Sequence, residues 1–162
     1  MPQLRAARVD DPLAHSLLTE YFAMRVEGFT DRVYNTVFPD PAKFTPPAGV
    51  FLIAELDGDP VGCAGIRMLS PVRAELKHLY VRDRARGHGV GGALVAELER
   101  QAVEFGATEM VLDTHDSLEA AARLYARAGY VTIEPYNDNP NASNWYGKGL
   151  RDAASGRSSA SE

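Results

Sequence analysis

A glycine-rich segment from Arg86 to Gly92 is the part of the sequence whose residue types most clearly indicate chemistry. It contains four glycines, Gly87, Gly89, Gly91 and Gly92. Glycines let the backbone approach a ligand closely, and the N-terminus of a following helix favours negative charge. Four neighbouring side chains add positive charge to an acidic chain, namely Arg82, Arg84, Arg86 and His88. The segment therefore predicts a site for a phosphate-bearing ligand.

A second nucleotide-binding pattern fits the same glycines. Gly87, Gly89 and Gly92 match G-x-G-x-x-G, and Asp113 follows about twenty residues later, as in dinucleotide-binding folds. In those folds the first glycine follows its strand almost at once, whereas residues 82–86 separate Val81 from Gly87 here. The strand before the turn also ends an antiparallel meander. A dinucleotide-binding module is therefore the less favoured alternative.

The elements that must position this turn follow from the hydrophobic pattern. A strand is predicted over Gln3–Val9, then a helix from an Asp11 cap to about Glu27 that ends at Gly28, and then an irregular stretch over residues 30–47. An antiparallel meander is predicted over three runs, Val50–Leu56, Val61–Leu69 and Arg73–Val81. The first two runs flank Asp57-Gly58, a strong hairpin signal.

Beyond the turn, an apolar stripe predicts the clearest helix of the chain. Its members are Leu94, Leu98, Ala102 and Phe105, and Gly106 can close it. A buried strand over Glu109–Thr114 and a helix from Asp116 or Ser117 to Ala128 should follow, with two last strands over Tyr130–Ile133 and Trp145–Leu150. This order predicts an α+β fold with a mixed, mostly antiparallel twisted sheet flanked by helices.

The sequence now resembles a known family. Arg86-x-x-Gly89-x-Gly91 is similar to the R/Q-x-x-G-x-G/A signature of the GNAT N-acetyltransferases. Their usual strand precedes it, and their Leu124-Tyr125 and Gly129-Tyr130 pairs follow. The resemblance covers roughly residues 50–150 and implies the acyl-CoA N-acyltransferase fold, in which two parallel strands separate to admit acetyl-CoA.

The resemblance also implies where acetyl-CoA would bind as co-substrate. Backbone amides of the turn would hold the pyrophosphate, and the strand before it would pair with the pantetheine arm. The residues implied are Leu79, Tyr80, Val81, Arg86, Gly87, His88, Gly89, Val90, Gly91, Gly92 and Tyr125. Relatives often carry an asparagine seven residues before the tyrosine, but this chain has Leu118 there.

Two side chains are candidates for catalysis in acetyl transfer to an amine. Glu75 stands where some relatives have a general base, although it could simply pair with Lys77, two residues away on the same face of the strand. Tyr125 stands where the family's tyrosine donates a proton to the leaving thiolate, although it could equally be a core residue. A catalytically silent acetyl-CoA sensor remains an alternative function.

The acceptor is expected to be a primary amine of a small molecule, amino acid or peptide. The resemblance places its pocket in residues 27–44 and 136–146, with Tyr34, Asn137 and Trp145 as candidate binding residues. Scattered histidines and the single Cys63 predict no metal site and no disulfide. Dimers are common in the family, so a homodimer is left open.

Composition limits the remaining classes of protein. With 162 residues, 45% hydrophobic, one domain over residues 1–150 is expected, followed by a flexible polar tail at 151–162. The formal charge of -5 disfavours nucleic acid and anionic membranes as partners. The N-terminus lacks an apolar signal and no run is long enough to span a bilayer, so a cytoplasmic location is expected.

Overall fold

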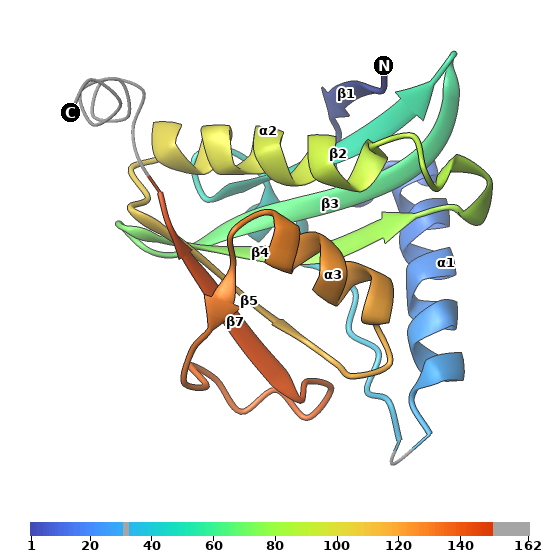
Figure 1. Ribbon diagram of the computed structural model, residues 1–162. Coiled ribbons are helices and arrows are strands. Elements are labelled where there is room, and N and C mark those ends of the chain that lie inside the picture. Colours follow the sequence, from blue (N-terminus) through green and yellow to red (C-terminus); the bar gives the residue numbers. More distant parts are fainter. Residues whose placement is uncertain (31–32, 151–162) are drawn as a thin grey trace.

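A seven-stranded sheet forms the centre of the computed structural model, which describes residues 1–30 and 33–150 (Figure 1). Its strand order is β1-β2-β3-β4-β5-β7-β6, and the β4–β5 pair is parallel whereas the other neighbouring pairs are antiparallel. The strands are β1 (Gln3–Ala6), β2 (Gly49–Leu56), β3 (Asp59–Ser70), β4 (Arg73–Val81), β5 (Glu109–Thr114), β6 (Val131–Thr132) and β7 (Asn144–Gly149). The predicted α+β fold with a mostly antiparallel sheet is confirmed. The predicted tail lies outside the described residues.

Three α-helices cover the two faces of this sheet. They are α1 (Pro12–Gly28), α2 (Val90–Glu104) and α3 (Glu119–Arg127), with short 3-10 turns η1 (Pro41–Phe44) and η2 (Asp83–Ala85). Successive strand residues point to opposite faces. In β2, Phe51 and Ile53 therefore pack with α1, whereas Leu52 and Ala54 pack with α2. Tyr125 of α3 belongs to the same core as Leu52, Ala54 and α2.

Local signals in the sequence form the turns that were predicted from them. The Asp11 carboxylate accepts a hydrogen bond from the Leu13 amide at 3.0 Å and caps α1. Asp57 and Gly58 both have positive φ, 51° and 81°, as a type I′ hairpin between β2 and β3 requires. Gly106, with φ 104°, follows the end of α2. Each signal acts through neighbours in the chain, which explains why the sequence was sufficient.

Some predicted boundaries are wrong, because tertiary contacts take over. β1 ends at Ala6, and Val9 is buried in the core beneath α1 instead of extending the strand. α3 begins at Glu119 and has no side-chain cap. Of the two caps predicted for it, Asp116 accepts a hydrogen bond from Asn144 at 2.6 Å, and the Ser117 hydroxyl contacts His115 Nδ1 at 2.9 Å.

Candidate active site

The parallel pair β4 and β5 separates halfway along its length. Pairing runs from Arg73 with Glu109 only as far as Glu75 with Val111, although β4 continues to Val81 and β5 to Thr114. Beyond that point the two strands diverge (Figure 1), and the Lys77 ammonium lies 4.0 Å from the Asp113 carboxylate across the gap. The facing edge of β4 is therefore free to bind an extended ligand, as a sheet edge does.

A bulge interrupts β4 at the same level. Gly65 pairs with Lys77 and Cys63 with Tyr80, so β4 contains one extra residue here, and His78 has a left-handed φ of 61°. The His78 ring packs against Tyr21, Phe22 and Phe44. Its Nδ1 is buried with no hydrogen-bond partner among the described residues. Bulges bend strands and re-aim backbone groups, so this one helps β4 turn away from β5.

His78 should make the folded state sensitive to acid. Burial, followed by the charges of Lys77, Arg67 and Arg25, lowers the pKa of His78 to about 3. The unfolded chain binds a proton near pH 6.5 that the folded chain does not, so stability falls as the pH drops from about 6.5 towards 3. Asparagine tolerates a positive φ, so His78→Asn can keep the backbone conformation. Between pH 7 and pH 5 we expect this variant to lose about 2 kcal/mol less stability than the native chain. Urea denaturation at both values measures this.

The matched control is His15→Asn, since His15 is exposed on α1. That variant should keep the full acid dependence of the native chain. An unchanged acid dependence in His78→Asn would contradict the assignment.

The glycine-rich turn presents free amides at the start of α2. Gly87 and Gly89 have φ of 84° and 75°, and Gly89 stands at the helix N-cap. The amides of Arg86 and His88 are used within the turn, where they bond the carbonyls of Asp83 and Ala85. The remaining amides make no hydrogen bond within the described part of the chain, and they belong to Gly87, Gly89, Val90, Gly91 and Gly92. Such a group of amides suits an anion.

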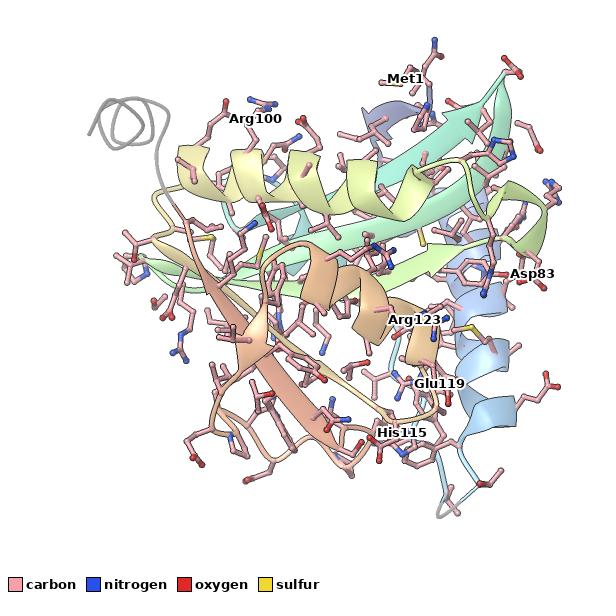
Figure 2. The ribbon with its side chains drawn as sticks, in the orientation of Figure 1. Met1, Asp83, Arg100, His115, Glu119 and Arg123 are labelled. Atoms are coloured by element: carbon pink, nitrogen blue, oxygen red, sulfur yellow. The ribbon has the colours of Figure 1, made fainter. Side chains whose placement is uncertain are left out.

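The positive charge of this region is distributed differently from the prediction. Arg82 Nε donates to Glu20 at 2.8 Å, and Arg84 Nε donates to Asp59 at 2.9 Å, so carboxylates neutralise both. Arg86 is exposed beside Asp83, at 3.1 Å. Arg123 of α3, which sequence reasoning did not select, lies towards the end of β4 with no ion pair to any described residue (Figure 2). Near the turn, Arg123 thus has no ion pair to a described residue, and Arg86 has an exposed pair with Asp83.

A cavity of about 860 Å³ connects the turn with the opposite face of the sheet. Near the turn it is lined by Val81, Arg86 and Arg123, and along the separated strands by Leu79, Tyr80 and Tyr125. At its other end it reaches Tyr34 and Asn137. The structure therefore brings seven of the fifteen predicted residues to one cavity, whereas Glu75, Trp145 and the residues from Gly87 to Gly92 are not among its described lining residues.

Tyr125 is both a core residue and a cavity residue. Its ring lies 5.8 Å from that of Tyr130 and 6.5 Å from that of Tyr146, and the residue is 6% exposed. Its hydroxyl makes no hydrogen bond to another described residue, and the side chain lines the cavity. Burial raises the pKa of Tyr125 above its ordinary value, so the hydroxyl stays protonated at neutral pH. It can therefore donate a proton into the cavity.

Glu75 is held by partners that the sequence did not indicate. Its Oε1 accepts from Arg67 Nε at 2.7 Å and its Oε2 accepts from the Tyr136 hydroxyl at 2.6 Å. The alternative of an ion pair with Lys77 is not observed, since Lys77 pairs with Asp113 among the described residues. The Glu75 side chain is 1% exposed, and Glu75 is not among the described residues that line the cavity. Both carboxylate oxygens thus have hydrogen-bond partners, and one of these partners, Arg67, lines the cavity.

Glu75→Gln should lower stability, because it removes a charge from a buried network. Charge-assisted hydrogen bonds contribute about 1.5–3 kcal/mol, so we expect a loss of that order in the free energy of unfolding. Urea denaturation tests this, with Glu104→Gln as the control. Glu104 pairs with Arg100 on the exposed side of α2 and should matter little. Native stability combined with lost turnover in Glu75→Gln would instead favour a general base.

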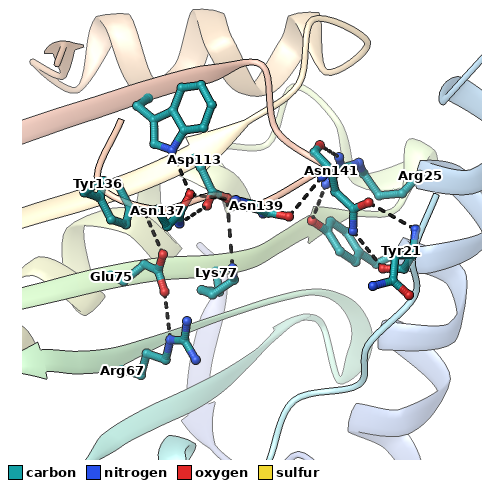
Figure 3. A network of polar contacts seen from close by, with 12 residues as sticks. Tyr21, Arg25, Arg67, Glu75, Lys77, Asp113, Tyr136, Asn137, Asn139 and Asn141 are labelled. Carbon is teal, nitrogen blue, oxygen red and sulfur yellow. Dashed lines mark hydrogen bonds and ion pairs between the residues drawn. The ribbon is translucent and has the colours of Figure 1, made fainter. Parts of the chain in front are cut away.

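A polar network lies on the sheet face beside the cavity (Figure 3). Asn137 Nδ2 donates to Asp113 at 2.7 Å, and Trp145 Nε1 donates to Asn137 Oδ1 at 3.0 Å. Tyr34 and Asn137 line the cavity. Trp145 is not among the described lining residues, and it contacts the site through its hydrogen bond to Asn137. Asp113 lines the cavity too, although the sequence marked it only for the dinucleotide alternative. Its position depends on where β5 parts from β4.

The fold and the site define an acyltransferase architecture. The chain is similar to the structure of the PaiA N-acetyltransferase from Thermoplasma acidophilum in complex with coenzyme A, with a TM-score of 0.73 at 16% identity over 93% of this chain and 99% of that one. A profile of the acetyltransferase (GNAT) family matches residues 13–130. The chain belongs to this family. A mostly antiparallel sheet is also incompatible with the dinucleotide alternative.

Two relatives are similar in sequence. An uncharacterized N-acetyltransferase of Schizosaccharomyces pombe is 41% identical over 100 residues, which are 60% of this chain and 61% of that protein. Another, of Chlorobaculum tepidum, is 31% identical over 138 residues, which are 81% of this chain and 76% of that protein. The chain thus spans less than two thirds of the length of the first relatives that it matches. No helix within residues 1–30 and 33–150 is long and apolar enough to cross a membrane.

Proposed function

We propose that this chain transfers an acetyl group from acetyl-CoA to a primary amine of a small molecule, amino acid or peptide by direct attack. The observation that carries the proposal is the separation of β4 from β5 beside one cavity, which is lined by Arg86 of the turn and by Asp113 and Asn137 of the polar network. A cofactor arm and an amine could meet in that cavity from opposite ends. The similar PaiA structure, which holds coenzyme A, supports the choice of co-substrate.

The chain offers a fitting set of groups for acetyl-CoA. The free amides from Gly87 to Gly92 and the Arg86 and Arg123 side chains suit a pyrophosphate. The unpaired edge of β4 over Leu79–Val81 suits a pantetheine arm with its amide groups. Gly91 lets α3 approach, because a Cβ there would lie 2.9 Å from Leu124 Cδ2. That approach places Tyr125 beside β4.

Acetyl-CoA supplies an activated thioester, from which thiolate departs as the amine forms its new bond to carbon. The chain then has two tasks. The Tyr125 hydroxyl, kept protonated by burial, donates a proton towards the departing sulfur. The proton lost by the amine needs an acceptor at the cavity surface. Asp113 lines the cavity, whereas Glu75 is enclosed by Arg67 and Tyr136 and would act only through these partners.

An acceptor screen tests the function. The chain is incubated with acetyl-CoA and a panel of amines, amino acids and peptides, and acetylated products are detected by mass spectrometry while thiol release is followed. Acetylation of at least one class of primary amine is the expected result. Acetyl-CoA binding without turnover on any acceptor would instead support a sensor.

Three further expectations remain proposals. One domain over residues 1–150 is supported by the continuous sheet that joins β1 to β7. A cytoplasmic location is consistent with a single cysteine, Cys63, that is buried as a free thiol. A homodimer can be checked by sedimentation velocity.

A further inference from the structure

Arg25 is a buried cation without an acidic partner among the described residues. It projects from α1, is 6% exposed and lines the cavity. Its Nη1 donates to the Tyr21 hydroxyl at 3.2 Å and its Nη2 to the Asn141 carbonyl at 2.8 Å, while Nε has no partner in the described part of the chain. No carboxylate forms an ion pair with it within residues 1–30 and 33–150. A buried charge with only neutral partners is costly unless an ion of opposite sign joins it.

The surroundings of Arg25 favour an anion. Burial is the main cause that lowers the pKa of His78, and every charge that adds to it is positive, from Lys77, Arg67 and Arg25. The nearby carboxylates already have partners, since Glu75 binds Arg67 and Tyr136. Tyr34 packs over the guanidinium, with its ring centroid 4.8 Å away, and limits access of water to the charge. The charges that act on His78 in this part of the cavity are therefore positive, while Asp113, which also lines the cavity, supplies a negative charge.

An acidic group lies at the other end of the same polar chain (Figure 3). Asp113 binds Asn137, Asn137 accepts from the Asn139 amide at 3.2 Å, and Asn139 accepts from the Asn141 amide at 3.0 Å. Asn141 then binds Arg25. Asn137 and Asn141 are four residues apart in sequence and therefore lie at most about 14 Å from each other, which sets the scale of a ligand that would contact both charges. The loop over residues 137–141 forms the wall between them.

The charges of Arg25 and Asp113 also act on the same tyrosine hydroxyls of the cavity. Burial raises the pKa of the Tyr21, Tyr34 and Tyr125 hydroxyls, and for all three the charge of Asp113 adds to the rise while that of Arg25 opposes it. Both groups therefore lie within electrostatic reach of the candidate proton donor. An acceptor with an amine at one end and an anion at the other matches this arrangement.

We propose that the acceptor is an amine that also carries a carboxylate, an amino acid or a short peptide acid, with its carboxylate on Arg25 and its amine beside Asp113. Arginine binds carboxylates through two parallel hydrogen bonds, and Nε with one Nη can supply them after a small rotation of the side chain. The amine end then lies at the level where β4 and β5 separate. This inference rests on the proposed function and specifies its substrate class.

The test compares each acceptor with its uncharged counterpart. L-amino acids and glycine-containing dipeptides are assayed as free acids and as C-terminal carboxamides, with native protein and Arg25→Gln. We expect native protein to prefer the acid by at least about tenfold in kcat/KM, and Arg25→Gln to lose about 100-fold on the acid but little on the carboxamide. Arg84→Gln, which breaks an exposed pair with Asp59, should leave the preference unchanged.

Other outcomes would overturn the inference in distinguishable ways. Native protein could instead show equal kcat/KM on acid and carboxamide, or Arg25→Gln could lose kcat/KM equally on both. Either result would mean that Arg25 only joins α1 to the 137–141 loop. If no acceptor is acetylated, the proposed function fails. The carboxylate site is then tested separately, by calorimetric measurement of the binding of the same compounds in the presence of coenzyme A. Binding of acids that Arg25→Gln loses would support the site, and no difference from carboxamides would reject it. Circular dichroism confirms that each variant is folded.

Discussion

Tyr125→Phe is expected to lower kcat by about 100-fold or more, since a positioned general acid contributes about 10²–10⁴. The change removes one hydroxyl that has no hydrogen-bond partner among the described residues, and it leaves the ring in its contacts with Tyr130 and Tyr146. Packing and acetyl-CoA affinity should therefore be nearly unchanged. Steady-state thiol release measures kcat, and calorimetry measures the Kd of acetyl-CoA.

Tyr130→Phe is the matched control, because Tyr130 is buried nearby and its hydroxyl donates to Glu99 at 2.9 Å rather than to the cavity. It should change stability more than kcat. If Tyr125→Phe instead weakens acetyl-CoA binding strongly, or leaves kcat at the native value, Tyr125 has a structural role only.

Gly89→Glu is expected to reduce acetyl-CoA affinity by at least about 100-fold. A carboxylate at this N-cap would face the pyrophosphate, and two like charges 4 Å apart repel by about 4 kcal/mol near a protein surface. The φ of 75° adds backbone strain of about 1–2 kcal/mol, although no atom lies within 4 Å of a new Cβ. Titration calorimetry with acetyl-CoA measures the affinity.

Gly58→Glu separates repulsion from strain. Gly58 has a similar φ of 81° and equally open surroundings, but it lies in the β2–β3 hairpin. Both variants should lose similar stability, whereas only Gly89→Glu should lose binding. Native affinity in Gly89→Glu would place the pyrophosphate elsewhere.

Much of the fold follows from signals that act over a few residues. The apolar stripe of Leu94 and Leu98 is the buried face of α2, and the Asp57-Gly58 pair forms the hairpin turn. The turn at Gly89 also lies where the motif predicts it, at the start of a helix. These features depend on helix and strand periodicity and on backbone conformations that glycine alone adopts easily.

The candidate site was predicted only in part. The cofactor side of the cavity follows a continuous stretch from Leu79 to Gly92, so a local motif could indicate it. The acceptor side joins residues that are far apart in sequence, such as Arg25 with Asn141, 116 residues away, and Glu75 with Tyr136, 61 residues away. A side chain's type does not reveal such partners. Arg25 and Arg67 were missed for this reason, and Asp113 was marked only for the dinucleotide alternative.

The turn, the order of the elements and the family could thus be predicted from the sequence, because each depends on spacing along the chain. Which charges remain available could be seen only in the folded chain. Arg82 and Arg84 are neutralised by Glu20 and Asp59, and Glu75 is enclosed by its partners. Arg25 lines the cavity and has no carboxylate partner within residues 1–30 and 33–150. Electrostatic pairing depends on distances of a few ångströms between remote segments, and only the packed sheet and helices set those distances.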